Sequence, residues 1–333
     1  MRDIPADPFF EYPASMHRVN HAVLGGRFTF ESNSRKLLKL VDQAFGGLPA
    51  HRFGSPMPRF RMRLRLIPQP RPPRHGEPPA MQLVSGSDWL GAVAAGSGCV
   101  MISPATRAGL LVIPETMLDH AYHLRYEWIE LATLTLAARA QTLIPLHAGC
   151  VGWRGRGVLL LGASGAGKST ACLHWLLRGH EFLAEDSVFV APETLCATAV
   201  PSFLHLREPA LGCVAPKMAA SFRAAPKVRR RSGIVKFEVD LRRMGGSLAP
   251  RPLPLSCVAL LSPRRARGAP LARRLTITEL RSHLLEAQPY AAVQPGWREF
   301  IARLAKLPLL ELRRGAHPDD TVAALESQLA GAS

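Results

Sequence analysis

The sequence predicts an α/β protein in which a phosphate-binding core follows a smaller α+β domain. An apolar strand at residues 158–161 leads into G-x-x-x-x-G-K-S and then a helical pattern. Polar and apolar residues alternate strictly over 59–66, as in a half-buried strand, and a long helical pattern at 115–140 separates the two regions. We therefore expect an N-terminal α+β domain over 1–120 and a core domain over 121–333.

In the N-terminal part we expect strands at 23–30, 59–66, 99–102 and 109–113, with a helix at 34–45 whose apolar residues recur at helical spacing. The strand at 59–66 places four arginines on one face, namely Arg59, Arg61, Arg63 and Arg65. The proline-rich stretch 68–79 cannot join a sheet ladder, so we predict a mobile loop there.

In the core we expect strands at 143–151, 157–161, 180–190, 234–239, 257–261 and 309–312. Helices are predicted at 169–178, 278–285, 297–304 and 318–329, and Gly179 stands where a glycine commonly ends a helix. The basic stretch 217–231 is predicted to be a mobile loop. The pattern has no internal repeat.

Composition describes a folded, basic protein. Of 333 residues, 47% are hydrophobic and 20% charged, and the formal net charge is +17. The charge favours an acidic partner such as a peptide, a nucleic acid or a phosphate-bearing ligand. No run has the length of a membrane span, and the N-terminus lacks the apolar segment of an export signal, so we expect a cytoplasmic protein that does not enter a membrane. The six cysteines are too widely spaced for a metal site or a disulfide framework and are expected to be buried free thiols.

The phosphate-binding loop is the most specific feature of the chain. Glycines let backbone N–H groups curl around phosphate oxygens, a lysine reaches the β and γ phosphates, and a serine hydroxyl can ligate Mg²⁺. The sequence therefore predicts binding of ATP and Mg²⁺ by Gly162, Ser164, Gly165, Ala166, Gly167, Lys168, Ser169 and Thr170.

Two adjacent acids, Glu185 and Asp186, follow the loop after a single helix. Apolar residues flank them on both sides, so a solvated acidic turn is disfavoured. One carboxylate there can hold Mg²⁺ at the phosphates, and the other can accept the proton of an attacking hydroxyl. His147 lies in the preceding strand, where a lone histidine is usually a core residue, so spacing leaves its role open.

Over residues 146–190 the chain resembles HPr kinase/phosphorylase, a bacterial serine kinase with a phosphoenolpyruvate-carboxykinase-like fold. The shared features are His147, the G-x-G-V-L-L-x-G-x-S-G-x-G-K-S run, R-G-H at 178–180 and A-[ED]-D-x-V at 184–188. The resemblance implies that Ser169 and Glu185 hold Mg²⁺, that Asp186 is the catalytic base and that His147 lies beside it. Lys168 completes the implied catalytic set.

The chain also departs from that family. Glu185 stands where the family has an aspartate, and the downstream glycine-rich signature is reduced to Arg207 and Glu208 in a similar setting. We therefore do not expect phosphorylase activity or HPr itself as the substrate. The whole chain is similar to HPr-kinase-related proteins that accompany peptide-modification genes, including serine kinases of lasso-peptide precursors.

Two arginine clusters are candidates for binding an acidic acceptor or its leader. One is the row at 59–65, and the other lies in 217–231, where Arg229, Arg230 and Arg231 can close over the phosphates. A solvated basic face is an equal alternative for each. Neither cluster has the interleaved aromatic residues of single-strand nucleic-acid binders, which disfavours nucleic acid as partner.

Three functions compete on this pattern. The first is an ATP-dependent kinase for a serine or other hydroxyl of a peptide or protein. The second is an ATP-gated peptide-binding module without phosphoryl transfer, and a third, ranked last, is an ATPase motor or transporter subunit. A kinase needs a base at Asp186, whereas a switch needs only a metal ligand. Homo-oligomerisation is left open.

Overall fold

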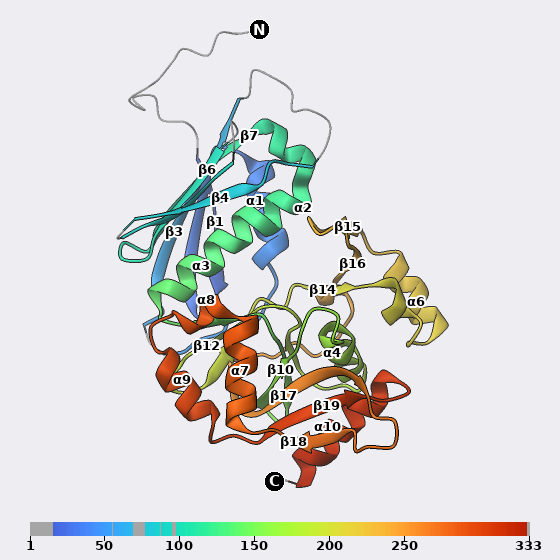
Figure 1. Cartoon of the computed structure of the whole chain (residues 1–333). Helices are drawn as coiled ribbons and strands as arrows, with labels where there is room; N and C mark the ends of the chain where they lie inside the picture. Colours follow the sequence, from blue (N-terminus) through green and yellow to red (C-terminus); the bar gives the residue numbers. More distant parts are fainter. Residues whose placement is uncertain (1–15, 55, 69–76, 87, 95–97, 332–333) are drawn as a thin grey trace. The chain divides into compact units, whose positions relative to one another are not determined.

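A computed structural model describes residues 16–54, 56–68, 77–86, 88–94 and 98–331. The chain forms two compact units, and each is described by itself (Figure 1). The first comprises residues 1–21, 27–46 and 59–136, and the second comprises 22–26, 47–58 and 137–333. The chain passes from the first unit to the second for the last time between Leu136 and Ala137, inside a helix. The domain boundary expected near residue 120 stays a prediction.

The first unit is built on a seven-stranded sheet with the order β1-β2-β3-β7-β6-β5-β4. Its strands are β1 (His17–Val23), β2 (Gly26–Ser32), β3 (Arg59–Ile67), β4 (Met81–Ser85), β5 (Leu90–Ala94), β6 (Gly98–Ser103) and β7 (Ala108–Pro114). β2, β3 and β7 run parallel, and β4 to β7 form an antiparallel meander.

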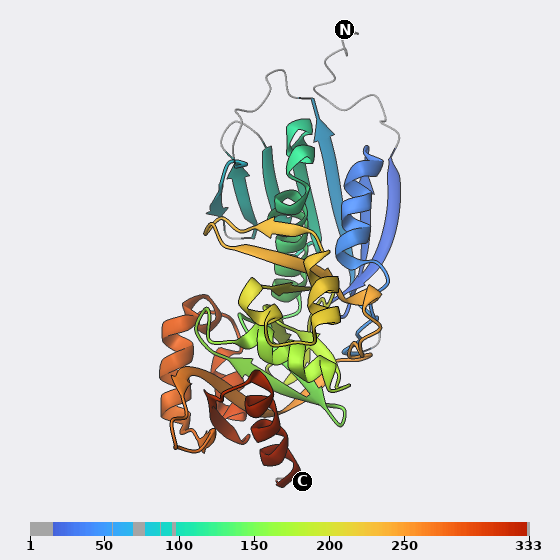
Figure 2. The same ribbon diagram turned by 90° about the vertical axis from the view of Figure 1, so that its right-hand side faces the viewer.

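Helices cover one face of this sheet (Figures 1 and 2). They are α1 (Arg35–Phe45) and a continuous helical stretch of η1 (Glu115–His120), α2 (Ala121–His123), η2 (Leu124–Glu130) and α3 (Leu131–Ala140). The covered face is apolar because alternate strand residues, among them Phe28, Phe60 and Leu111, are buried there.

The alternation predicted for β3 is confirmed: Phe60, Met62 and Leu64 are buried, and Arg59, Arg61 and Arg63 are exposed. The helix predicted at 34–45 and the strands at 99–102 and 109–113 are also present. A single strand at 23–30 was wrong, because Leu24 and Gly25 take positive φ values and turn the chain between β1 and β2. Most of the predicted loop at 68–79 lies outside the described residues.

The second unit carries a nine-stranded sheet whose path runs β11-β9-β10-β17-β13-β12-β8, with β19 beside β17 and β18 beside β19. The strands are β8 (Ile144–Leu146), β9 (Gly149–Trp153), β10 (Arg156–Leu161), β11 (Phe182–Ala184), β12 (Val188–Val190), β13 (Cys196–Thr198), β17 (Leu253–Arg265), β18 (Ala272–Arg274) and β19 (Leu309–Arg314). β10, β17 and β19 are parallel neighbours in its middle.

A smaller sheet of the second unit has the order β14-β16-β15, formed by β14 (Phe203–Leu206), β15 (Lys227–Arg229) and β16 (Val235–Asp240). The helices are α4 (Lys168–Leu177), α5 (Glu208–Leu211), α6 (Pro216–Arg223), η3 (Leu241–Arg243), α7 (Ile277–Ala287), α8 (Pro289–Ala292), α9 (Trp297–Leu304) and α10 (Pro318–Gly331). The buried cores include Trp175, Phe182 and Phe300. The unit is thus a mixed α/β structure, as expected.

Two expectations about the second unit were wrong. The stretches 143–151 and 180–190 are not single strands: each is interrupted, at His147–Ala148 and at Glu185–Ser187. The stretch 217–231 is not wholly loop, because α6 and β15 occupy most of it. β15 pairs with β16, and Phe222 of α6 is buried, so tertiary contacts organise this basic segment.

The six cysteines are free thiols, as predicted, but only Cys150, Cys172 and Cys257 are buried. The expectation of burial was wrong for Cys99, Cys196 and Cys213, which are partly exposed. Burial raises the pKa of the Cys257 thiol to about 12, so this group is an inert core residue. Among the described residues, no helix combines the length and the apolar character that a bilayer crossing requires.

Candidate active site

The phosphate loop connects the C-terminal end of β10 to the N-terminus of α4. Gly165 and Gly167 have φ values of +79° and +108°, a conformation that side chains with a Cβ rarely adopt. A Cβ at either position would meet no atom within 4 Å, so these glycines are required by the backbone path and not by crowding. Residues of the first turn of α4 line the cavity beside the loop, and the N-terminus of a helix favours an anion.

Lys168 begins α4 and folds over this loop. Its Nζ donates to the carbonyl oxygen of Gly162 at 2.7 Å, and the residue is only 7% exposed. Desolvation lowers the pKa of Lys168, while the charges of Asp186 and Glu185 act in the opposite direction. A partly desolvated ammonium with few partners gains strongly from an incoming phosphate.

Two breaks, one between β8 and β9 and the other between β11 and β12, bring His147 to the two acids. β9 pairs with β11 up to Cys150 and Ala184, and β8 pairs with β12 from Leu146 and Val188. Residues 147–148 and residues 185–187, which lie between these paired segments, are therefore opposite one another. The Ala148 N–H donates to the Asp186 carbonyl at 3.2 Å across the gap.

Asp186 has two cationic or hydrogen-bonding neighbours. Its Oδ1 lies 2.7 Å from Nδ1 of His147, and its Oδ2 lies 3.4 Å from Nη2 of Arg230. Burial acts to raise the pKa of Asp186, but the hydrogen bond and charge of His147, followed by the charges of Arg230 and Lys236, hold it well below its usual value. Asp186 is therefore a carboxylate at neutral pH.

Glu185, the residue directly after β11, is buried. Its Oε1 accepts from the backbone N–H and from Nδ1 of His205, at 2.9 and 3.0 Å, whereas its Oε2 is buried with no hydrogen-bond partner among the described residues. Burial acts to raise the pKa of Glu185, yet the His205 hydrogen bond and the surrounding charges give a net lowering. A buried carboxylate oxygen without a partner is costly unless a cation binds it.

The residues present therefore fit a hard divalent cation bound with a nucleotide. Oxygen ligands from carboxylates and hydroxyls are those that Mg²⁺ prefers, and it commonly takes one or two protein ligands together with phosphate oxygens. Ser169 on the first turn of α4 and Glu185 both line the same cavity.

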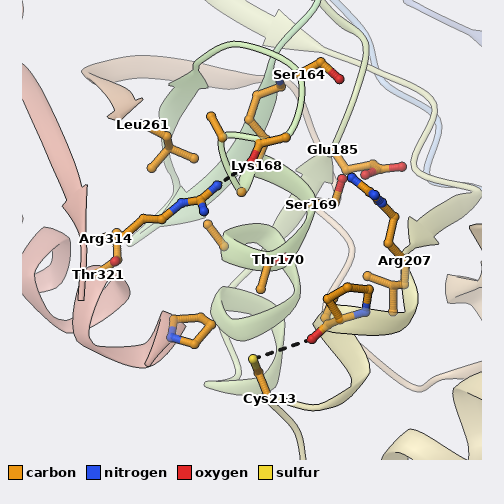
Figure 3. Close-up of a pocket in the computed structure, with 18 of the residues that line it drawn as sticks. Ser164, Lys168, Ser169, Thr170, Glu185, Arg207, Cys213, Leu261, Arg314 and Thr321 are labelled. Carbon is orange, nitrogen blue, oxygen red and sulfur yellow. Dashed lines mark hydrogen bonds between the residues drawn. The ribbon is translucent and has the colours of Figure 1, made fainter. Parts of the chain in front are cut away.

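This cavity has a volume of about 610 Å³. Loop residues 164–170 form one wall, and Glu185 and Asp186 form another. Figure 3 shows Glu185 and Arg207 near Ser169, with Arg314 reaching the loop from the opposite side, where its guanidinium donates to the Gly165 carbonyl. Lys236 adds a further cation to the lining. The space is large enough for a nucleotide and is rich in positive charge.

The predicted site residues separate into three groups. His147, Glu185, Asp186, Arg207 and the loop from Ser164 to Thr170 line one cavity. Gly162 contacts Lys168, and Arg230 contacts Asp186. Glu208 instead pairs with Arg223 at the surface, and neither it nor Arg229 nor Arg231 is among the cavity-lining residues.

Sequence reasoning missed several residues of this site. His205 joins Glu185 to Glu238, which lies 3.2 Å from its Nε2, and these carboxylate contacts raise the pKa of His205 although burial opposes them. Gln288 holds the backbone of His147: its Oε1 accepts from the His147 N–H at 2.9 Å, and its Nε2 donates to the His147 carbonyl at 3.3 Å. The only sequence signal for His205 was its place two residues before Arg207.

A second cluster, of which His317 also lines the cavity, has residue types found in metal centres. His174, His317 and Asp319 place one ligand atom each within 4.8 Å of one another. Asp319, however, already contacts His174 at 2.9 Å, His317 at 3.3 Å and Arg178 at 3.6 Å. Nδ1 of His317 accepts the Asp319 N–H, and its Nε2 contacts the Cys213 carbonyl. The engaged atoms and the nearby guanidinium make this cluster an ion-pair tether between α4 and the start of α10.

Comparison with known proteins finds relatives of part of the chain. It is 37% identical over 109 residues to the HPr kinase/phosphorylase of Geobacter sulfurreducens, which is 31% of this chain and 32% of that protein. It is also 37% identical over 76 residues to the HPr kinase/phosphorylases of Listeria welshimeri and Listeria monocytogenes, covering 22% of this chain and 24% of each relative. The chain thus spans about a third or less of the length of these relatives and is an HPr-kinase-related protein over the matched segment.

Two other comparisons add no argument. No family model matches the chain. The HPr(Ser) kinase/phosphatase of Coxiella burnetii is similar with a TM-score of 0.30 and 13% sequence identity, covering 56% of this chain and 97% of that one. The specific phosphoenolpyruvate-carboxykinase-like core therefore stays a prediction.

Proposed function

We propose that this protein is an ATP- and Mg²⁺-dependent kinase that transfers the γ-phosphoryl group to a serine, or another hydroxyl, of a peptide or protein. The observation that carries the proposal is the His147–Asp186 pair beside the cavity of the phosphate loop, with the unpartnered Glu185 Oε2 next to it. The partial identity to HPr kinase/phosphorylases supports the same reaction class.

The loop and the cavity cations bind and orient the nucleotide. Backbone N–H groups at the start of α4 would contact phosphate oxygens, and Lys168 would exchange the Gly162 carbonyl for the β and γ phosphates. Arg207, Lys236 and Arg314 line the same cavity and would offset the charge of the equatorial oxygens in the transition state.

Ser169 and Glu185 are the groups that would hold Mg²⁺. When bound, the ion would neutralise charge on the β and γ phosphate oxygens. Two donors of His205 hold Oε1 of Glu185. Because both oxygens belong to one planar carboxylate, these contacts also fix the direction of Oε2. His205 would therefore set the orientation of Glu185.

Asp186 would accept the proton of the acceptor hydroxyl. The hydroxyl oxygen forms a bond to the γ phosphorus, the bond from that phosphorus to the β,γ-bridging oxygen breaks, and ADP leaves. Asp186 is ionised but weakly basic because of His147 and Arg230. It therefore accepts the proton late, once the bond to phosphorus has made the hydroxyl acidic, and His147 keeps Oδ1 in place.

The acceptor would be a peptide or protein, with a ribosomal peptide precursor as the class that the chain's resemblances favour. The basic cavity mouth and the net charge of +17 suit an acidic segment near the acceptor residue. We propose that the protein acts in the cytoplasm.

The test is phosphoryl transfer from γ-labelled ATP to candidate precursor peptides and to HPr, read by intact mass, with three matched variants. Wild type should add one phosphate to a peptide serine or threonine. Asp186→Asn should bind ATP as wild type does but slow transfer by about a hundredfold or more. Lys168→Ala should lose ATP binding, and the surface variant Lys306→Ala should behave as wild type.

The same experiment separates the kinase from an ATP-gated binding module. Transfer at the wild-type rate by Asp186→Asn would eliminate the proposed base. Tight ATP binding with no transfer to any acceptor would favour the binding module, since a switch needs the loop and Glu185 but no base.

A further inference from the structure

The sheet of the first unit has one face that helices do not cover. Residues on that face are identified by strand register: Glu31 pairs with Arg63, Arg63 with Leu110, Leu110 with Met101, and Met101 with Gly91. Because directly paired residues of adjacent strands point to the same side, these residues form one row across the sheet. The neighbouring row runs from Arg65 through Val112, Cys99 and Val93 to Gln82.

One half of this face is basic. It carries Arg18, Arg27, Arg59, Arg61, Arg63 and Arg65 on β1, β2 and β3. Within the described rows of this face Glu31 is the sole acidic residue, and Arg18 at 2.6 Å and Arg63 at 3.6 Å already neutralise it. Side chains of Arg18 and Arg63 are 62% and 52% exposed, so this half presents an excess of positive charge to solvent.

The other half is apolar and also exposed. Met101 and Val93 are each 45% exposed, and Val84 is 41% exposed. Trp89 is 38% exposed and lies over Gly91, where an added Cβ would come within 3.1 Å of the indole ring and 3.3 Å of Val84. An exposed tryptophan beside methionine and valine has the composition of a binding hot spot.

We propose that this mixed face, defined as the arginines of β1 to β3 together with Val84, Trp89, Val93 and Met101, binds a segment in which an acidic stretch is followed by an apolar one. The segment would belong to the polypeptide that receives the phosphoryl group, and in this respect the inference rests on the proposed function. Acidic side chains would meet the arginine half, and apolar ones would cover the tryptophan half.

A second copy of this chain is a poorer occupant. The arginine excess of the face would meet a chain whose own net charge is +17, and the one acid on the face is already paired. An acidic stretch brings the opposite charge, and an apolar stretch beside it matches the division of the face into a basic and an apolar half.

The experiment measures binding by the full chain, without nucleotide, so that it does not depend on phosphoryl transfer. The probe is a short fluorescein-labelled peptide in which a run of glutamates is followed by a run of leucines, and its anisotropy is titrated. One comparison peptide replaces glutamate with lysine, and another replaces leucine with serine. Variants are Arg61→Glu and Met101→Asp on the face, with Arg35→Glu as control, since Arg35 is exposed at the start of α1 in the same unit.

We expect saturable binding of the glutamate–leucine peptide, about tenfold weaker binding by Arg61→Glu and by Met101→Asp, and no change for Arg35→Glu. Trp89→Phe should remove the change in tryptophan fluorescence that accompanies binding. Binding should weaken with added salt. The two altered peptides should each bind at least about tenfold more weakly.

Three results would overturn the inference: no binding of the glutamate–leucine peptide, equal binding of the lysine peptide, or wild-type binding by both face variants. Concentration-dependent dimerisation that Met101→Asp abolishes would also overturn it, because a second copy would then occupy the face. If the peptide binds as expected while no acceptor is ever phosphorylated, the proposed function fails and the docking face stands.

Discussion

Nδ1 of His147 lies 2.7 Å from Oδ1 of Asp186. His147 lies in the break between β8 and β9, Asp186 lies in the break between β11 and β12, and the two breaks face each other. A regular strand alternates its side chains between two faces and engages its backbone in the ladder. The paired breaks release both residues from that constraint. Asp186 is thereby held by a histidine at the edge of the phosphate cavity while its neighbour Glu185 turns into the protein.

The unpartnered oxygen of Glu185 predicts a metal-specific defect. Glu185→Gln keeps an oxygen acceptor for His205 but removes the negative charge, so the concentration of Mg²⁺ at half-maximal ATP binding should rise about tenfold or more. Thermal stability should fall modestly, because the charge of Glu185 is paired with His205, which helps to lower the pKa of Glu185.

Titration of nucleotide binding against Mg²⁺ by calorimetry measures this defect. Glu238→Gln is the matched control, since Glu238 also contacts His205 but is not among the residues that line the cavity. An unchanged Mg²⁺ requirement in Glu185→Gln would remove Glu185 from the metal site.

The clamp of Gln288 on His147 predicts a coupled loss of stability and transfer rate. Gln288→Leu has a similar volume but cannot bond the His147 N–H and carbonyl, so it should cost about 1–3 kcal/mol of unfolding free energy. Because His147 positions Asp186, kcat should fall about tenfold while the KM for ATP stays within about twofold.

Urea unfolding and steady-state kinetics on the same samples separate the two effects. Gln294→Leu is the comparison, as Gln294 is also buried and donates to the Tyr290 carbonyl at 2.7 Å but, within the described part of the chain, is not bonded to His147. An equal loss of kcat in both variants would show general destabilisation and no specific role for Gln288.

The tether between α4 and α10 predicts an acid-dependent contribution to stability. Burial acts to raise the pKa of Asp319, but the hydrogen bond from His174 and the charges of His174, Arg178 and His317 lower it below its usual value. A group with a lowered folded-state pKa stabilises the fold above its unfolded pKa of about 3.9, and this contribution is lost as pH falls through the folded value.

Asp319→Asn should therefore lower the free energy of unfolding at pH 7, and its difference from wild type should shrink as the pH is lowered below about 4. Chemical unfolding at a series of pH values gives this difference directly. Glu208→Gln, which breaks an exposed pair with Arg223, should show a much smaller and flatter difference. A constant deficit for Asp319→Asn at every pH would assign its role to packing.

Local pattern was sufficient for much of the fold. The alternation of β3, the helix at α1, the strand–loop–helix around Lys168 and the C-terminal helices were all predictable, because the burial period and the turn residues are written in consecutive positions. The breaks at His147 and Glu185 were not, since each flanking stretch is uniformly apolar and the period carries no sign of an interruption.

The sequence by itself determined the phosphate loop, the order of loop and acids, and the basic character of the chain, because each depends on residue identity at short spacing. The family resemblance implied that His147 lies beside Asp186, and the tertiary structure shows their contact at 2.7 Å. Only the tertiary structure decided that Glu185 has one oxygen without a partner among the described residues, and that Arg230 belongs beside the acids while Glu208 does not. Those relations depend on strand register and on segments up to 141 residues apart, as with Gln288 on His147. Contacts of that range follow from how sheets pair and pack, which no local pattern encodes.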